Sequence, residues 1–207
     1  MAVNLRAIMR LRRRFHHDTR GVTAIEFSLI AVPFFGLLMA IIELGLRFLI
    51  NSNLDAAVRQ ASRAILTGAA QTSGVTTADQ FRTTYLCPAT GPSILNSIID
   101  CRKLIIDVRA SSTFGAANIS NDFYKNQAGN TFCPGSSNAI TILRVAYPMP
   151  SYLPILALGT GGGIGVNTTG LVNDVPNNPG WKHLLIATSA MQVENFHSAQ
   201  YTPPSGC

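Results

Sequence analysis

A long apolar stretch near the N-terminus dominates the pattern of hydrophobic and polar positions in this chain. Residues 27–42 contain no charged residue, and Ser28 is the only polar side chain among them. As an α-helix these residues would be about 24 Å long, whereas a membrane-spanning helix usually needs about 20 residues. Residues 44–50 extend the stretch, because the guanidinium of Arg47 can reach the membrane surface along its aliphatic stem. We therefore predict one transmembrane helix at residues 24–49.

The helical pattern continues beyond the predicted membrane segment. Apolar residues recur there at helical spacing, with polar side chains on the opposite face: Leu54, Ala57, Val58, Ala61 and Ile65. Nothing breaks this pattern before Gly68, which predicts a continuous helix over residues 22–67, about 69 Å long. Small and polar residues follow at positions 68–78, as is typical of a linker. Residues 79–86 are predicted to form a short helix leading to Cys87.

Three later segments show the alternation of a strand with one buried face. The positions that share the mainly apolar face are Leu104, Ile106, Val108 and Ala110; Thr141, Leu143, Val145 and Tyr147; and Leu185, Ala187, Ser189, Met191 and Val193. The first set alternates with Lys103, Asp107 and Arg109. We predict a small antiparallel sheet that packs against the helix beyond the membrane. The expected fold class is α+β, with residues 68–207 as the exported domain.

Two segments between the strands have no regular pattern. Residues 111–138 are rich in serine, asparagine and glycine, which predicts a long polar excursion. Residues 152–159 are apolar without strand alternation. They could belong to the core, or they could form an exposed patch that contacts a membrane or a partner subunit.

The positive charge is concentrated at the N-terminus. Residues 1–21 contain one acid, Asp18, and six arginines: Arg6, Arg10, Arg12, Arg13, Arg14 and Arg20. The other residues contain ten basic and nine acidic side chains, so the net charge of +6 describes an arm and not a basic domain. An arginine-rich arm beside an apolar span is typical of a cytoplasmic flank in a membrane protein. The sequence therefore predicts no nucleic-acid partner.

The junction between arm and apolar stretch carries a motif. Gly21 is followed by four residues, then by Glu26, the aromatic Phe27 and the apolar stretch. This resembles the processing site of type IV-type prepilins, and most of all the Tad (Flp-type) branch, where a tyrosine replaces Phe27. Residues 20–31 together with 42–45 resemble the TadE-like family of pilus-assembly proteins. Weaker similarity continues at residues 104–108, 144–148 and 187–196.

The resemblance implies that a membrane prepilin peptidase cuts between Gly21 and Val22. Gly21 suits a narrow cleft because it has no side chain to exclude. Cleavage would leave an ammonium group on Val22, with which the Glu26 carboxylate of a neighbouring copy could pair and so fix the register of a helical bundle. The family also implies a non-enzymatic bacterial inner-membrane component whose bulk is periplasmic. Its expected partners are membrane lipid, the peptidase, other pilins or pseudopilins and Tad assembly proteins.

Two alternatives remain open at this point. The chain could be a permanently anchored scaffold or assembly factor that is never cut. It could also be an exported protein with a twin-arginine or Sec signal, because residues 12–15 read Arg-Arg-Arg-Phe before an apolar stretch. No small-x-small cleavage site closes that stretch near residue 45.

The four cysteines all follow the predicted membrane helix: Cys87, Cys101, Cys133 and Cys207. None forms a CxxC pair, and an even number on an exported side predicts two disulfides. Sequence alone allows three connectivities. Cys87–Cys101 with Cys133–Cys207 is favoured, because the first pair closes a short loop.

The sequence contains no recognisable catalytic chemistry. Residues 159–165 are glycine-rich but match neither phosphate-loop pattern, and no serine-nucleophile elbow occurs. His183 and His197 stand without a cysteine or carboxylate framework for a metal ion. We therefore expect no catalytic residue, no metal and no cofactor.

Overall fold

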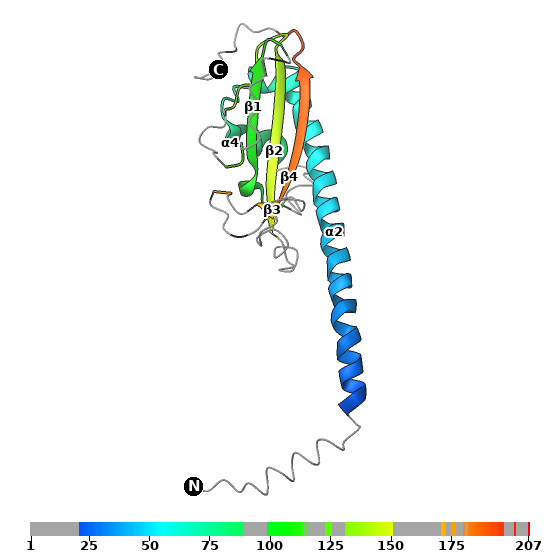
Figure 1. Ribbon diagram of the computed structural model, residues 1–207. Helices are drawn as coiled ribbons and strands as arrows, with labels where there is room; N and C mark the ends of the chain where they lie inside the picture. The colour runs from blue at the N-terminus through cyan, green and yellow to red at the C-terminus, as the bar shows by residue number, and fades with distance from the viewer. Residues whose placement is uncertain are drawn as a thin grey trace, which may run out of the picture. The chain divides into compact units, whose positions relative to one another are not determined.

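The computed structural model describes residues 21–88, 99–113, 115, 123–125, 131–150, 171–172, 175–176, 180, 182–196, 201 and 207 (Figure 1). The arginine arm, the apolar segment 152–159, the glycine-rich segment 159–165 and, within the excursion 111–138, residues 114, 116–122 and 126–130 lie outside the described residues. The chain divides into two units, Met1–Ile42 and Glu43–Cys207.

Helix α2 is the longest element and contributes to both units. It comprises 45 residues, Val22–Leu66, and includes Pro33 without interruption. Its length agrees with the helix predicted over residues 22–67. In the first unit, every large apolar side chain of α2 is exposed. In the second unit, α2 has an apolar face that is buried.

The segment after α2 is packed, although its composition suggested a linker. Gly68 has φ +75°, and a Cβ at this position would lie 2.4 Å from the Phe196 ring, so a side chain cannot be accommodated where α2 ends. Helix α3 follows at Ala69–Thr72. Ala70 and Gln71 are buried, and Gln71 Nε2 donates to the carbonyls of Ile65 and Pro134, both at 3.2 Å. Small residues pack closely here, and composition alone does not distinguish that role from a linker.

Two short helical segments then lead to the first disulfide. Helix α4 (Ala78–Phe81) begins with a capping box formed by Thr77 and Gln80, which satisfies the free N–H groups of its first turn. The π-helical turn η2 (Arg82–Leu86) continues to Cys87. This region agrees with the short helix predicted at residues 79–86. A 3₁₀ turn, η3 (Cys101–Lys103), precedes the first strand.

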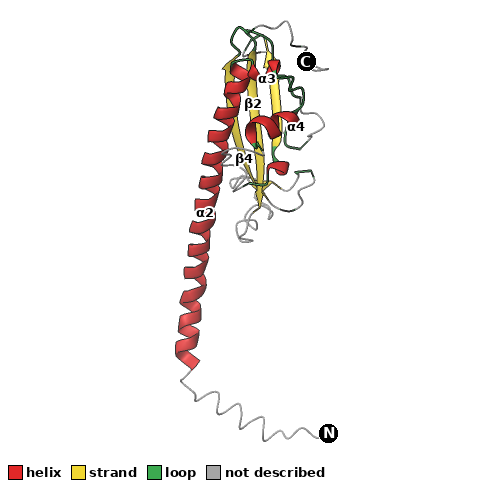
Figure 2. Cartoon of the chain, turned by 180° about the vertical axis from the view of Figure 1, so that it is seen from behind, coloured by secondary structure: helices red, strands yellow, loops and turns green. Residues whose placement is uncertain are grey.

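The strands form one antiparallel sheet, which confirms the predicted α+β fold. They are β1 (Ile105–Ser111), β2 (Ile140–Pro150), β3 (Leu171–Val172) and β4 (Lys182–Gln192). The order in the sheet is β1-β2-β4-β3, with β2 paired to β4 along its whole length. Figures 1 and 2 show the strands on one side of the second unit and α3 and α4 on the other.

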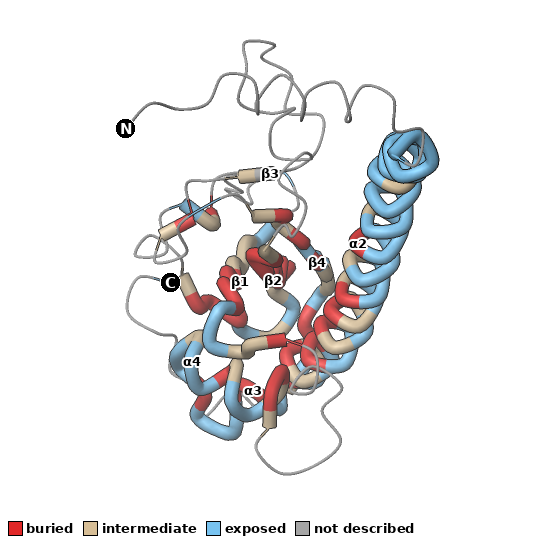
Figure 3. Tube along the Cα trace, turned by 90° about the horizontal axis from the view of Figure 1, so that it is seen from below, coloured by how far each residue is buried: buried red, intermediate tan, exposed pale blue. Residues whose placement is uncertain are grey.

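The main core lies between the sheet and the helices. On α2 it contains Ile50, Leu54, Val58, Ala61 and Ile65, and on the strands it includes Val108, Leu143, Val145, Tyr147, Leu185 and Ala187. Figure 3 shows the buried positions of α2 in the second unit on its side toward the strands. The strand positions are those that the alternating pattern predicted to be buried. The burial of these apolar side chains is the main favourable contribution to folding.

The opposite face of the sheet is also partly covered. Ile105 and Ala146 form a second cluster with Phe123 and Val175, which come from segments outside the strands. As a result, all but the last residue of β2 is buried. Alternation along β1 correctly predicts which residues share a face, but it does not show that later segments cover the other face.

The outer edge of β1 is occupied by a short parallel segment. Val108 N donates to Thr131 O, and Cys133 N donates to Val108 O, each at 2.9 Å. Cys133 is bonded to Cys207, and Cys87 is bonded to Cys101. These are the two pairs that the sequence analysis favoured. Because an exposed strand edge can recruit foreign strands, this segment protects one side of the sheet.

Candidate functional site

The motif residues lie together at the start of α2. Gly21 directly precedes the helix and Val22 is its first residue. Glu26 and Phe27 follow in the next turn, and both are exposed, Phe27 to 70 %. Among the described residues, Glu26 forms no ion pair. The motif is therefore an accessible helix start, with a glycine at its boundary and a carboxylate close behind.

In the first unit, the large apolar side chains of α2 are exposed along the whole of this part of the helix. Its exposed large side chains are Val22, Ile25, Phe27, Leu29, Ile30, Val32, Phe34, Phe35, Leu37, Leu38, Met39, Ile41 and Ile42. The Ser28 hydroxyl donates to Ala24 O at 2.8 Å, so its polar group is satisfied inside the helix. α2 is long and apolar enough to cross a membrane. A helix of this kind is stable in lipid, where its backbone needs no outside partner.

A buried polar pair marks the beginning of the second unit. Glu43 on α2 and His183 on β4 are each only 3 % exposed, and His183 Nε2 lies 3.1 Å from Glu43 Oε1. The sequence analysis missed this pair, since it placed Glu43 inside the predicted membrane span and treated His183 as isolated. A carboxylate within an apolar stretch is itself a signal that a partner exists. The partner could not be identified, because it lies 140 residues away in the sequence.

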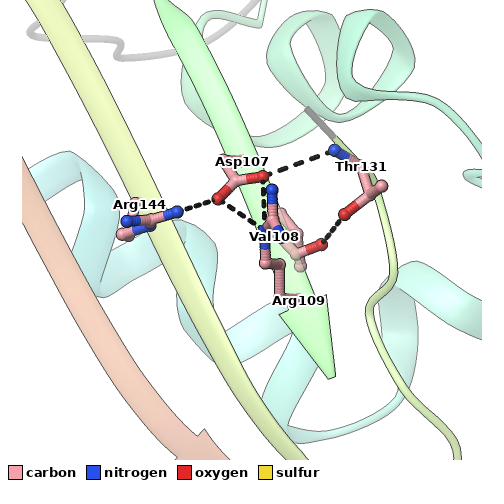
Figure 4. A network of polar contacts seen from close by, with 5 residues as sticks. All are labelled: Asp107, Val108, Arg109, Thr131 and Arg144. Atoms are coloured by element: carbon pink, nitrogen blue, oxygen red, sulfur yellow. Dashed lines mark hydrogen bonds and ion pairs between the residues drawn. The ribbon is translucent and has the colours of Figure 1, made fainter. Parts of the chain in front are cut away.

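A second polar network lies within the sheet. Asp107 on β1 is completely buried and pairs in register with Arg144 on β2, to which it forms a direct ion pair (Figure 4). Arg109 Nε donates to both oxygens of Asp107 at 3.1 Å, and Thr131 N donates to Oδ1 at 3.3 Å. The Arg144 guanidinium also lies 4.4 Å from the centre of the Phe123 ring. This network joins β1, β2 and the edge segment, so its role is structural.

A shallow cleft of about 610 Å³ lies beside the Cys133–Cys207 disulfide. Its lining includes Arg109 and Tyr201, together with small polar residues. Burial raises the pKa of the Tyr201 phenol above its ordinary value. The cleft brings together no nucleophile and base, and the described residues contain no group of three metal-ligating side chains.

Among the described residues, one helix is long and apolar enough to cross a membrane, and it continues into an α+β unit. Residues 21–63 match the family model described as TadE-like protein. The match contains the motif, the apolar helix and Glu43, and covers less than half of the chain. No curated protein and no solved structure matches this chain.

Proposed function

We propose that this protein is a membrane-anchored, non-enzymatic, pseudopilin-like component of a Tad-type pilus-assembly machine. The observation that carries the proposal is the coincidence of two features on one helix. The TadE-like match covers residues 21–63, and α2 exposes a mainly apolar surface over the first half of that segment, with Glu26 near its start. TadE-like proteins are associated with pilus assembly and are generally structural.

The membrane span in this proposal is residues 22–42, shorter than the 24–49 expected from hydropathy. Ile50 belongs to the core of the second unit and Glu43 is buried there, so neither side chain is available to lipid. Residues 22–42 form about 32 Å of helix, close to the hydrocarbon thickness of about 30 Å. The arginine arm would keep the N-terminus cytoplasmic, with the second unit in the periplasm. Two disulfides suit that oxidising compartment.

In the proposed function the apolar helix binds other helices as well as lipid. A prepilin peptidase would cut between Gly21 and Val22, and the new ammonium group would lie at the membrane surface. The Glu26 carboxylate of a neighbouring pilin or pseudopilin could then pair with it. Such a pair in a low-dielectric environment specifies register more than it adds stability. Other Tad assembly proteins would be the further partners, and no nucleic acid is involved.

The N-terminal sequence of the mature protein, purified from membranes, tests this proposal. A start at Val22 is the expected result. A start at Met1 or Ala2 would instead indicate an uncleaved scaffold or assembly factor. A start beyond about residue 45 would indicate a removed signal peptide, and the membrane anchor would be lost with it.

Replacing Gly21 with leucine is expected to abolish cleavage while membrane insertion continues. A leucine side chain at the cut bond would not fit a cleft built for glycine. Gly36→Leu is the matched control, because a Cβ at either glycine meets nothing within 4 Å. The measurement is the size of the membrane-bound product on a gel. If the Gly21→Leu protein still reaches its cut size, the cleavage site is wrong.

Replacing Glu26 with glutamine is expected to reduce assembly about tenfold while the amount of membrane-bound protein changes less than about twofold. The amide keeps the shape of the side chain but cannot form an ion pair with the Val22 ammonium. Asp55→Asn, the same change farther along α2, is the control. Assembly is measured by chemical cross-linking between copies or to other pilins in intact membranes. Equal cross-linking in both variants would contradict the pairing role.

A further inference from the structure

In the second unit, the side chains of α2 that contact the sheet are unevenly distributed along the helix. From Ile50 onward, α2 is held by a continuous apolar face. Over residues 43–49 the only buried side chain is that of Glu43, and the other six positions are exposed or half-exposed. Glu43 therefore contacts the sheet at an isolated position on α2. The nearest buried apolar side chain of the helix, Ile50, lies about 10 Å farther along the helix axis.

The contact at Glu43 is polar on both sides. Its partner, His183, is the second residue of β4 and uses Nε2. The other ring nitrogen, Nδ1, is buried without a hydrogen-bond partner among the described residues. His183 thus contributes one hydrogen bond at the cost of an unsatisfied atom. An arrangement of this kind adds little net stability, because desolvation offsets most of the attraction.

We propose that the Glu43–His183 pair is a polar lock that holds residues 43–49 of α2 on the beginning of β4. When the lock opens, these two turns pivot away from the sheet about Ile50. The segment from Leu54 to Ile65 stays packed, because its contacts are apolar and fully buried. The lock therefore sets the position of residues 43–49 of α2 relative to the sheet within the second unit, whichever pilus role the chain has.

The physical basis is the difference between the two parts of the contact. The apolar face of α2, with five buried side chains, can leave the sheet only if that apolar surface becomes exposed to water, which costs much free energy. A single buried polar pair separates at low cost once either group finds another partner, such as water. The open and closed positions of residues 43–49 therefore differ by a small free energy. A binding partner that prefers one of the two positions can shift the equilibrium toward it.

The lock can be tested in the full chain in detergent micelles by measuring distances between two spin labels. One label replaces Phe48 on the pivoting turns and the other replaces Ile186 on β4, since both side chains are exposed. All four native cysteines are in disulfides, so introduced thiols can be labelled selectively. His183→Ala is expected to increase the ratio of open to closed molecules roughly tenfold. A second label pair at Arg59 and Thr188 should keep its distance.

Three further variants make the result specific. Glu43→Ala should open the contact as His183→Ala does, and the double variant should open it less than the sum of the two single variants, because both single variants remove the same Glu43–His183 contact. His183→Gln should restore the closed distance, since its amide can donate to Glu43. An unchanged distance in Glu43→Ala would overturn the proposal. So would an equal change in both label pairs, which would mean that the whole unit had loosened.

Discussion

Replacing Arg144 with methionine is expected to lower the free energy of unfolding by about 3–5 kcal/mol. Arg144 is buried and forms an ion pair with Asp107, whose side chain is completely inaccessible to water. Without the guanidinium, the Asp107 carboxylate would keep Arg109 and the Thr131 N–H but lose its most buried counter-charge. Urea unfolding of the full chain in micelles, followed by near-ultraviolet circular dichroism, measures this loss.

Two controls separate charge from packing in the Arg144 experiment. Arg109→Met should cost only about 1 kcal/mol, because the Arg109 side chain is 23 % exposed and its ion pair is screened by water. The double variant Asp107→Leu with Arg144→Met should regain much of the lost stability, since no buried charge remains unpaired. If Arg144→Met and Arg109→Met were equally stable, the assignment of Arg144 as the principal counter-charge would be incorrect.

Replacing both Cys133 and Cys207 with alanine is expected to cost about 4.5 kcal/mol of stability on the chain-entropy estimate. The two residues are 74 positions apart, so their bond removes many conformations from the unfolded chain. In the folded state it also secures the segment that pairs with the outer edge of β1. The same unfolding experiment applies, with hydrogen exchange of the backbone amides at positions 108 and 133 as a local measurement.

The other disulfide provides the matched comparison. Cys87 and Cys101 are 14 positions apart, and replacing both with alanine should cost about 3 kcal/mol. Its loss should leave exchange at the β1 edge unchanged. A larger loss of stability from the Cys87–Cys101 variant would show that loop length does not govern these bonds.

The repeating patterns of the sequence predicted the elements of this fold well. Apolar residues at helical spacing from Leu54 to Ile65 identified the face of α2 that packs on the sheet. Alternation identified the buried face of β1, including Ile106 and Val108. Both predictions follow from local geometry, because the period of a helix or strand decides which side chains share a face. The sequence motif at Gly21 and Glu26 likewise lies within the TadE-like match.

Contacts between distant segments could not be predicted from those patterns. Asp107 alternates with apolar residues and was expected on the polar face of β1, yet it is completely buried. Its burial depends on Arg144 and on residues after position 120, which no local period reveals. The same limitation hid the Glu43–His183 pair. It also hid the packing of α3, where alanine and glycine allow close approach although they resemble a linker in composition.

The pairing of α2 with β4 has a mechanical consequence. Both elements run in the same direction: Glu43 contacts His183 at one end, and Glu194 N donates to Leu66 O at the other. The helix rises about 35 Å between its two contact residues and the strand about 36 Å, so their lengths match. A force applied along the helix axis would therefore load the whole interface in shear, instead of peeling contacts apart one by one. In this geometry, tension along the helix is distributed over the apolar contacts between Ile50 and Ile65.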